Sequence, residues 1–263
     1  MRTTSNPAFR NLPTTGGYAN FNYGQGQQTA PFGQAPVAPP QTARPMTIDD
    51  VVTKTAITLG LAVITGTLTY LVGPPAVALA LPAAIIGLVI SLVIIFKKKI
   101  SPALVIAYSA VEGVFLGGIS YVFGSLFSPG IIIQAIAGTI GVFAAMLVVY
   151  KTGAIRVTPK LTKWIIGALA GVAVLMLVNM IASFFTPGGL GLRDGGGLAI
   201  AFSLVCIGIA AFSFLLDFDA ADKAIKGGVD AKFAWYIAFG LMTTLVWLYL
   251  EILRLLSYFQ SSD

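Results

Sequence analysis

The stretch 235–257, WYIAFGLMTTLVWLYLEILRLLS, decides the fold class of this chain. It is apolar along most of its length, and the charged residues within it are Glu251 and Arg254. A helix of about 20 residues, rising ~1.5 Å per residue, crosses the ~30 Å hydrocarbon core of a bilayer. The stretch is therefore predicted to form a membrane-spanning helix.

Six further apolar segments of similar length precede this stretch. Turn signals separate them, among them Gly73-Pro74-Pro75 and the basic run Lys97–Lys99. We therefore predict an all-α membrane protein whose transmembrane domain, residues 47–259, contains seven helices. The predicted spans are approximately 51–73, 76–96, 102–124, 131–150, 163–185, 198–221 and 235–257.

Two pairs of glycines within the spans have the spacing that lets transmembrane helices approach closely. They are Gly113-x-x-x-Gly117 and Gly167-x-x-x-Gly171. Glycine is frequent throughout the chain, so this is a weak signal. It predicts close helix contacts along the third and fifth spans.

The composition supports a membrane protein. Of 263 residues, 57% are hydrophobic and 10% are charged, and the mean hydropathy is +0.88. A soluble domain would carry about 25% charged residues. The chain has no histidine and one cysteine, Cys206, which removes Ser–His and Cys–His nucleophiles and histidine-ligated zinc. We expect a protein that is not an enzyme and that holds no resident cofactor.

The distribution of basic residues predicts how the chain is oriented. All but two of its 16 lysines and arginines fall in the N-terminal region or in alternate connections between spans, and the exceptions are Arg193 and Arg254. Because positive residues concentrate on the cytoplasmic side, we predict a multi-pass protein of the cell membrane with a cytoplasmic N-terminus and a C-terminus on the far side. This bias accounts for the net charge of +6, so no nucleic-acid partner is expected.

Residues 1–46 differ from the rest of the chain. They are rich in Gly, Pro, Gln, Asn, Thr and Ala and show no apolar periodicity. Such a segment cannot bury enough surface to fold, so we predict a disordered cytoplasmic tail. The simpler interpretation is a solvated segment. The alternative is a segment that binds a protein partner through its scattered aromatic residues.

Four acidic residues fall within the apolar segments: Glu112, Asp217, Asp219 and Glu251. A carboxylate inside a bilayer is costly unless it is protonated, paired or facing water, so these residues are candidates for an ion or proton path. Calcium prefers oxygen ligands. Transient binding of Ca²⁺ at Asp217 and Glu112 is therefore a hypothesis, and no resident metal site is predicted.

Each acid also has a structural interpretation. Asp219 is explained equally by a helix end that reaches water, and Glu251 by a local ion pair with Arg254 three residues later. Glu112 is deep and has no basic residue on its own helix, which leaves open a role in transport or a protonated, hydrogen-bonded structural role. Asp217 follows an unbroken apolar run and requires either a proton or a basic partner.

Several stretches of the chain carry a family resemblance. They are MTIDDVVTKTAITLGL, AYSAVEGVFLGGIS, LLDFDAADKAIKGG and FGLMTTLVWLYLEILRLLSYF. On these stretches, and over about residues 46–259, the chain resembles the Bax inhibitor-1 family of seven-span membrane proteins, and more closely its actinobacterial-type branch with a Gly/Pro/Gln-rich N-terminal tail. The resemblance implies a fold in which six helices surround a central seventh, and a pH-sensitive calcium leak.

The resemblance also implies a pH sensor. In this sensor an aspartate late in the sixth span shares a proton with an aspartate in the seventh span. A nearby basic residue, the latch, is able to pair with the sixth-span aspartate. Asp217 matches the sixth-span aspartate. The residue that corresponds to the seventh-span aspartate depends on how this chain is matched to the family pattern. If the match is made on Leu-Tyr-Leu followed by an acid, Glu251 corresponds to it. If the match is made on Leu-Arg-Leu-Leu, Thr244 corresponds to it. Estimated depth favours Thr244, and Glu112, at similar depth, then becomes our candidate for the second carboxylate. The candidate latch residues are Lys97, Lys98 and Lys99.

Three functions remain open at this point. The leading hypothesis is a pH-sensitive calcium, or more generally cation, leak channel gated by protonation of intramembrane carboxylates, with Ca²⁺ and H⁺ as its ionic partners. The second is a non-conducting regulator that acts on a membrane protease or a stress-survival partner through residues 1–46. The third and weakest is a proton-coupled transporter, for which the sequence names no substrate.

Overall fold

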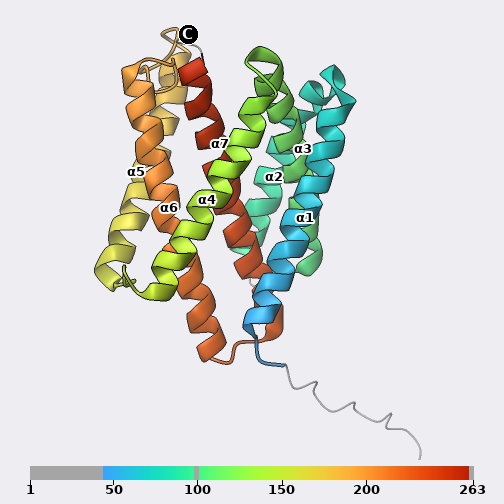
Figure 1. Ribbon diagram of the computed structural model, residues 1–263, viewed down its shortest axis with the longest axis vertical. Coiled ribbons are helices and arrows are strands. Elements are labelled where there is room, and N and C mark those ends of the chain that lie inside the picture. Colours follow the sequence, from blue (N-terminus) through green and yellow to red (C-terminus); the bar gives the residue numbers. More distant parts are fainter. Residues whose placement is uncertain (1–43, 98–100, 261–263) are drawn as a thin grey trace, which may run out of the picture. The chain divides into compact units, whose positions relative to one another are not determined.

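The computed structural model describes residues 44–97 and 101–260, and within these ranges it contains seven α-helices long and apolar enough to cross a membrane (Figure 1). The predicted all-α, seven-span class is confirmed. The helices are α1 (Ile48–Val72), α2 (Pro74–Phe96), α3 (Pro102–Leu126), α4 (Gly130–Thr152), α5 (Pro159–Ser183), α6 (Gly197–Lys226) and α7 (Ala234–Gln260), and a 3₁₀ turn, η2 (Ala231–Phe233), precedes the last.

Two helices, α5 and α6, extend furthest beyond the apolar segments from which they were predicted. Helix α6 continues past residue 221 to Lys226, and its last turns carry two ion pairs between aspartates and lysines four residues apart. Helix α5 begins at Pro159, where proline suits the first helical position and the side chain of Thr158 caps the helix. A prediction based on hydropathy leaves out the polar turns at the ends of a helix.

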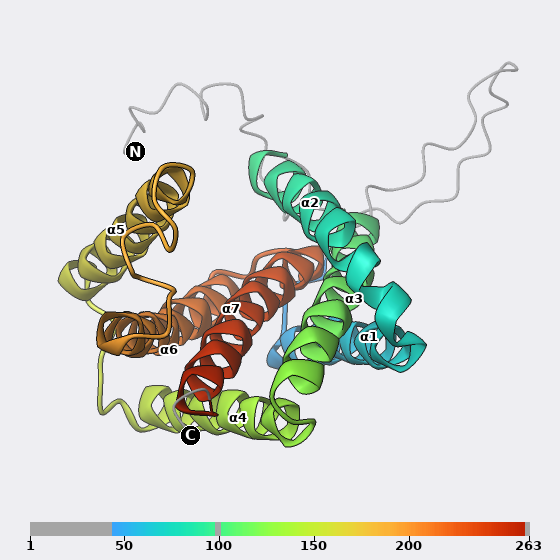
Figure 2. The ribbon, with the colours of Figure 1, turned by 90° about the horizontal axis from the view of Figure 1, so that it is seen from above.

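Helix α7 is the central helix of the bundle. It packs against α1, α3, α4 and α6, and Figure 2 shows it among these helices in the view from above. Helix α2 packs mainly on α3, and α5 packs on α6, so these two helices lie outside the first layer around α7. Met242, Leu248 and Leu253 of α7 are fully buried. Polar groups on such a helix need partners within the protein.

Glycines allow α1 and α3 to pack closely. A Cβ added to Gly113 or Gly117 of α3 would overlap atoms of α1, including, for Gly117, the carbonyl oxygen of Gly66. The first predicted glycine pair therefore lies at a close helix contact. Gly167 and Gly171 of α5 have no such neighbour within 4 Å. The prediction for the fifth span is wrong, because α5 is a peripheral helix whose glycines face open space.

The segment before α1 is bound to the connection between α6 and α7. The amide of Met46 donates to the Val229 carbonyl at 2.7 Å, and the amide of Ala231 donates to the Arg44 carbonyl at 2.9 Å. Met46 is buried, with 2% of its surface exposed. Residues 44–46, at the end of the stretch predicted to be a disordered tail, are therefore part of the fold. Residues 1–43 lie outside the described residues.

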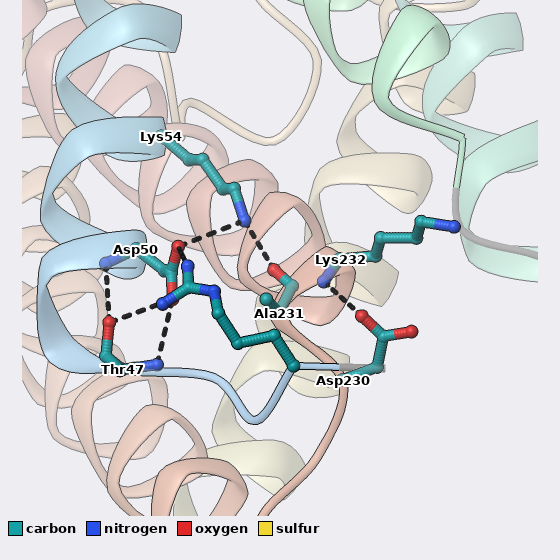
Figure 3. A network of polar contacts seen from close by, with 7 residues as sticks. Thr47, Asp50, Lys54, Asp230, Ala231 and Lys232 are labelled. Atoms are coloured by element: carbon teal, nitrogen blue, oxygen red, sulfur yellow. Dashed lines mark hydrogen bonds and ion pairs between the residues drawn. The ribbon is translucent and has the colours of Figure 1, made fainter. Parts of the chain in front are cut away.

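Side chains in the first turns of α1 reinforce this connection (Figure 3). The Asp50 carboxylate accepts hydrogen bonds from the Thr47 amide at 3.0 Å and hydroxyl at 2.8 Å, and it forms an ion pair with Arg44 at 2.6 Å. Lys54, one turn later, donates to the Ala231 carbonyl. We call these residues (Arg44, Thr47, Asp50, Lys54 and Ala231) the α1 entry junction.

The start of α1 and the end of α7 lie at opposite ends of the bundle, as an odd number of spans requires (Figure 1). The end that holds the start of α1 also holds the α4–α5 and α6–α7 connections. Lysines gather in and around these connections, and we call this end the basic end. The distal end holds residues 184–196, which connect α5 to α6, and the end of α7. The membrane side that each end faces stays a prediction.

Candidate functional site

The interface between α6 and α7 holds the Asp217 carboxylate inside the bundle. The Thr244 hydroxyl of α7 donates to Asp217 Oδ2 at 2.8 Å, and it also lies 3.2 Å from the Gly240 carbonyl one turn earlier. Asp217 precedes the end of α6 at Lys226 by about as many residues as Thr244 follows the start of α7 at Ala234. A short connection therefore brings the two side chains to the same level of the bundle.

The second oxygen of this carboxylate faces the backbone of α7. A Cβ added to Gly240 would stand 3.6 Å from Asp217 Oδ1, so the glycine leaves room for the carboxylate to lie against one turn of the helix. Of the two seventh-span positions considered from the sequence, it is Thr244 and not Glu251 that lies opposite Asp217. A threonine hydroxyl cannot share a proton as a second carboxylate would.

Asp217 has no basic partner in the described part of the chain. None of the ion pairs among residues 44–97 and 101–260 involves it. Lys97, the residue that follows α2, is exposed and forms no ion pair among the described residues. Lys98 and Lys99 lie outside the described residues. The lysine latch therefore stays a prediction. An unpaired carboxylate in an apolar environment is costly when ionised, so a proton or a passing cation at Asp217 would lower the free energy of the bundle.

Glu112 lies at a different helix interface. It is 8% exposed, and its Oε2 faces α2, where a Cβ added to Gly87 would stand 2.9 Å from it. The hydroxyl of Tyr108, one turn earlier on α3, interacts with its carboxylate. Among the described residues, no hydrogen bond, ion pair or electrostatic interaction joins Glu112 to Asp217. The structure does not bring these two carboxylates together, because they face different neighbouring helices.

Glu251 is paired at the distal end of the bundle. Both of its carboxylate oxygens accept hydrogen bonds from the Arg193 guanidinium, at 2.7 and 2.8 Å, and Arg254 lies 3.4 Å from Oε1. Glu251 is 2% exposed. The local pair with Arg254 expected from the sequence is present, but Arg193 is the closer partner. The bidentate geometry is the strongest form of this interaction.

Sequence reasoning missed the role of Arg193. This residue belongs to the glycine-rich connection between α5 and α6, and its guanidinium also lies 5.1 Å from the ring centroid of Phe202. Loop residues follow no periodicity that would indicate where their side chains point. One feature of the sequence could have indicated this pairing. Arg193 and Arg254 are the two basic residues outside the N-terminal region and the alternate connections, and both lie near Glu251.

Asp219 lies in the amphipathic last turns of α6. It forms an ion pair with Lys223 at 2.6 Å, and Asp222 pairs with Lys226 at 2.5 Å. Both lysine side chains are largely exposed, at 70% and 73%. Exposed pairs of this kind contribute little to stability. The interpretation of Asp219 as part of a helix end near water therefore agrees with its surroundings.

The carboxylates do not gather into a metal centre. Within residues 44–97 and 101–260, no group of three or more aspartates, glutamates and cysteines is placed so that it could hold a metal ion. Resident calcium takes six to eight oxygen ligands, which a single carboxylate beside a hydroxyl does not supply. Transient binding of Ca²⁺ at Asp217 stays a prediction.

The fold and these buried acids define an integral, multi-pass membrane protein with seven helices and ionisable groups inside its bundle. A family model described as Bax inhibitor 1 like matches residues 6–261, which is nearly the whole chain. The chain therefore belongs to the Bax inhibitor 1 like family. A comparison with curated proteins finds no match. The actinobacterial-type branch stays a prediction.

Proposed function

We propose that this protein is a pH-sensitive calcium leak in the cell membrane. The observation that carries the proposal is the Asp217 carboxylate, which lies between two helices of the bundle with a threonine hydroxyl as its partner and no basic residue paired with it in the described chain. Membership in the Bax inhibitor 1 like family supports the membrane setting. The proposal is one of transport rather than catalysis.

The proposed mechanism rests on competition between a proton and a cation for one carboxylate. When Asp217 is ionised, its charge attracts Ca²⁺, whose preferred ligands are oxygens, and the Thr244 hydroxyl lies ready as a neutral second oxygen. When Asp217 is protonated, the charge is lost and the hydroxyl and carboxyl groups remain hydrogen-bonded to each other. Calcium flux is therefore expected to decrease as the pH falls from 8 to 6.

The other acids have different roles in this proposal. Glu251 is neutralised by Arg193 and supported by Arg254, so we assign it to stability rather than to ion binding. Glu112 lacks a basic partner but faces α2, so we assign it a separate position along the path and not a shared proton with Asp217. We further propose that the basic end is cytoplasmic, on the grounds of its lysines.

The test is calcium flux into vesicles that contain the purified full-length protein and a calcium-sensitive dye. The proposal predicts flux above that of protein-free vesicles, and a pH dependence between pH 6 and 8. Glu112→Gln is expected to reduce the flux without removing its pH dependence. If the wild type leaks no more than empty vesicles at any pH, the protein does not conduct, and a regulator acting through residues 1–46 becomes the better interpretation.

A further inference from the structure

An apolar groove of about 490 Å³ lies among α1, α3, α4 and α7, and the α7 residues that line it are on a different face of that helix from Thr244. Its floor is formed by buried residues of α7, including Met242 and Tyr249. Its rim includes Val63 of α1 and Ile140 of α4, which are 65% and 60% exposed, so the groove opens sideways. Binding sites for small molecules have this size and this mostly apolar lining.

The length and depth of the groove correspond to one leaflet of a bilayer. Along α1 its lining residues run from Leu59, near the middle of the helix, to Tyr70, close to its distal end. This distance is about 17 Å at ~1.5 Å per residue. Half of a ~30 Å hydrocarbon core is about 15 Å. The groove thus reaches from the midplane region of the bundle to its distal end.

The surroundings of the groove indicate the kind of occupant. The helices that line it are long and apolar enough to cross a membrane, so its lateral opening faces the hydrocarbon of a bilayer. The residues that line it carry no charged side chain. A hydrocarbon chain therefore matches the lining and the opening of the groove.

Hydroxyl groups gather towards the distal end of the groove. The Tyr249 hydroxyl lies 2.7 Å from the Ser120 hydroxyl, and both residues line the groove together with Tyr70. Tyr70 also packs edge-on against Tyr121, with ring centroids 5.8 Å apart. Tyrosines favour the boundary between hydrocarbon and lipid headgroups. The polar part of a lipid would therefore lie at this end, and the end of its chain near Met242.

We propose that this groove binds one acyl chain of a membrane phospholipid from the leaflet at the distal end. The apolar lining, the lateral opening and the length of one leaflet favour this occupant. The proposal does not depend on calcium conduction, because it concerns a different face of α7 from the one that carries Thr244. A bound chain would fill space between α1 and α4 that the protein leaves open.

The test compares two tryptophan substitutions on α4. Ile136→Trp fills the groove, since Ile136 lines it and is 46% exposed, whereas Ile133→Trp places the same side chain on the same helix at a residue that does not line it and is 72% exposed. The full-length proteins are purified in mild detergent with palmitoyl-oleoyl phosphatidylcholine, and bound lipid is counted by native mass spectrometry. Wild type and Ile133→Trp should retain one lipid, and Ile136→Trp at least fivefold less.

A second readout locates the chain. Phosphatidylcholine with a photoactivatable diazirine at the end of one acyl chain should cross-link preferentially near the inner end of the groove, at Leu59, Thr139 or Met242. Thermal unfolding curves check that both variants are folded. Equal lipid retention by all three proteins would overturn the proposal, and so would equal cross-linking along α2 and α5, cross-linking of the groove to a second copy of the chain, or the absence of retained lipid in the wild type.

Discussion

At the scale of single residues, the same chemical group has different surroundings at each position in this bundle. The Glu251 carboxylate is held by two arginines, that of Asp217 by a hydroxyl, and that of Glu112 lies against a glycine of the next helix. A charge in an apolar medium is stable only with a partner, so the partner indicates the role of each acid. Paired acids stabilise the fold, and unpaired acids are the ones available to protons and cations.

Arg193 is expected to stabilise the fold through its ion pair with Glu251. Arg193→Met leaves Glu251 buried with Arg254 as its remaining basic partner, and removing one member of a buried pair typically costs about 3 kcal/mol. We expect a clearly lower midpoint of thermal unfolding in detergent. Arg156→Met is the control, because Arg156 is exposed and forms no ion pair among the described residues, and it should change stability by less than about 0.5 kcal/mol. Equal midpoints for both variants would show that the cluster does not stabilise the fold.

Of the two residue-scale predictions that rested on depth, the placement of Thr244 opposite Asp217 agrees with the structure, whereas the placement of Glu112 beside Asp217 does not. Counting along two antiparallel helices joined by a short connection was enough to place Thr244 near Asp217. The partner of Glu251 was not predictable in this way, because Arg193 comes from a glycine-rich connection without periodicity. The direction that Glu112 faces was not predictable either, because on a helix that is apolar on most sides no stripe indicates which side packs on α7.

At the scale of the elements, the helices followed from hydropathy because a bilayer offers no water to backbone groups. Every peptide group in the hydrocarbon must be hydrogen-bonded within the protein, so a long apolar run has no alternative to a helix. The ends of α5 and α6 were misjudged because they are polar. Packing partners were not predictable from glycine spacing alone, since the pair in α3 contacts α1 whereas the pair in α5 contacts nothing.

Two glycine substitutions test the packing of α1 against α3. Gly117→Ala places a Cβ against the backbone of α1, and overpacking of this kind costs about 1–3 kcal/mol. Gly167→Ala places the same methyl group in open space and should stabilise α5 by up to about 1 kcal/mol. Thermal unfolding in detergent should therefore shift in opposite directions. A stabilising effect of Gly117→Ala would mean that the two helices are further apart than described.

The α1 entry junction is expected to hold the start of α1 to the α6–α7 connection. Lys54→Met removes a charged donor to the Ala231 carbonyl, a hydrogen bond worth about 1.5 kcal/mol or more. The amides of Met46 and Ala231 should then exchange with deuterium about tenfold faster. Lys232→Met, in the same connection, is the control. The ammonium group of Lys232 makes no ion pair in the described chain, so its removal should leave the exchange rates unchanged. If both variants exchange at the wild-type rate, the side chain of Lys54 does not hold the junction.

At the scale of the whole molecule, α7 separates two regions of different character. One of its faces meets α6 and carries Thr244 opposite Asp217, and another forms the floor of the apolar groove between α1 and α4. Its distal end carries Glu251, fastened to the connection between α5 and α6. Because Thr244 of α7 is the hydrogen-bond partner of Asp217, a movement of α7 at this level would change the surroundings of that carboxylate.

The proposed role of Asp217 is tested by measuring calcium flux at pH 6, 7 and 8 for three proteins in identical vesicles: wild type, Asp217→Asn and Asp222→Asn. Both variants remove one carboxylate from α6, but Asp222 is already paired with an exposed lysine. We predict that Asp222→Asn keeps the wild-type decrease in flux towards pH 6, and that Asp217→Asn shows low flux without pH dependence. A wild-type pH profile in Asp217→Asn would mean that this carboxylate does not control the flux.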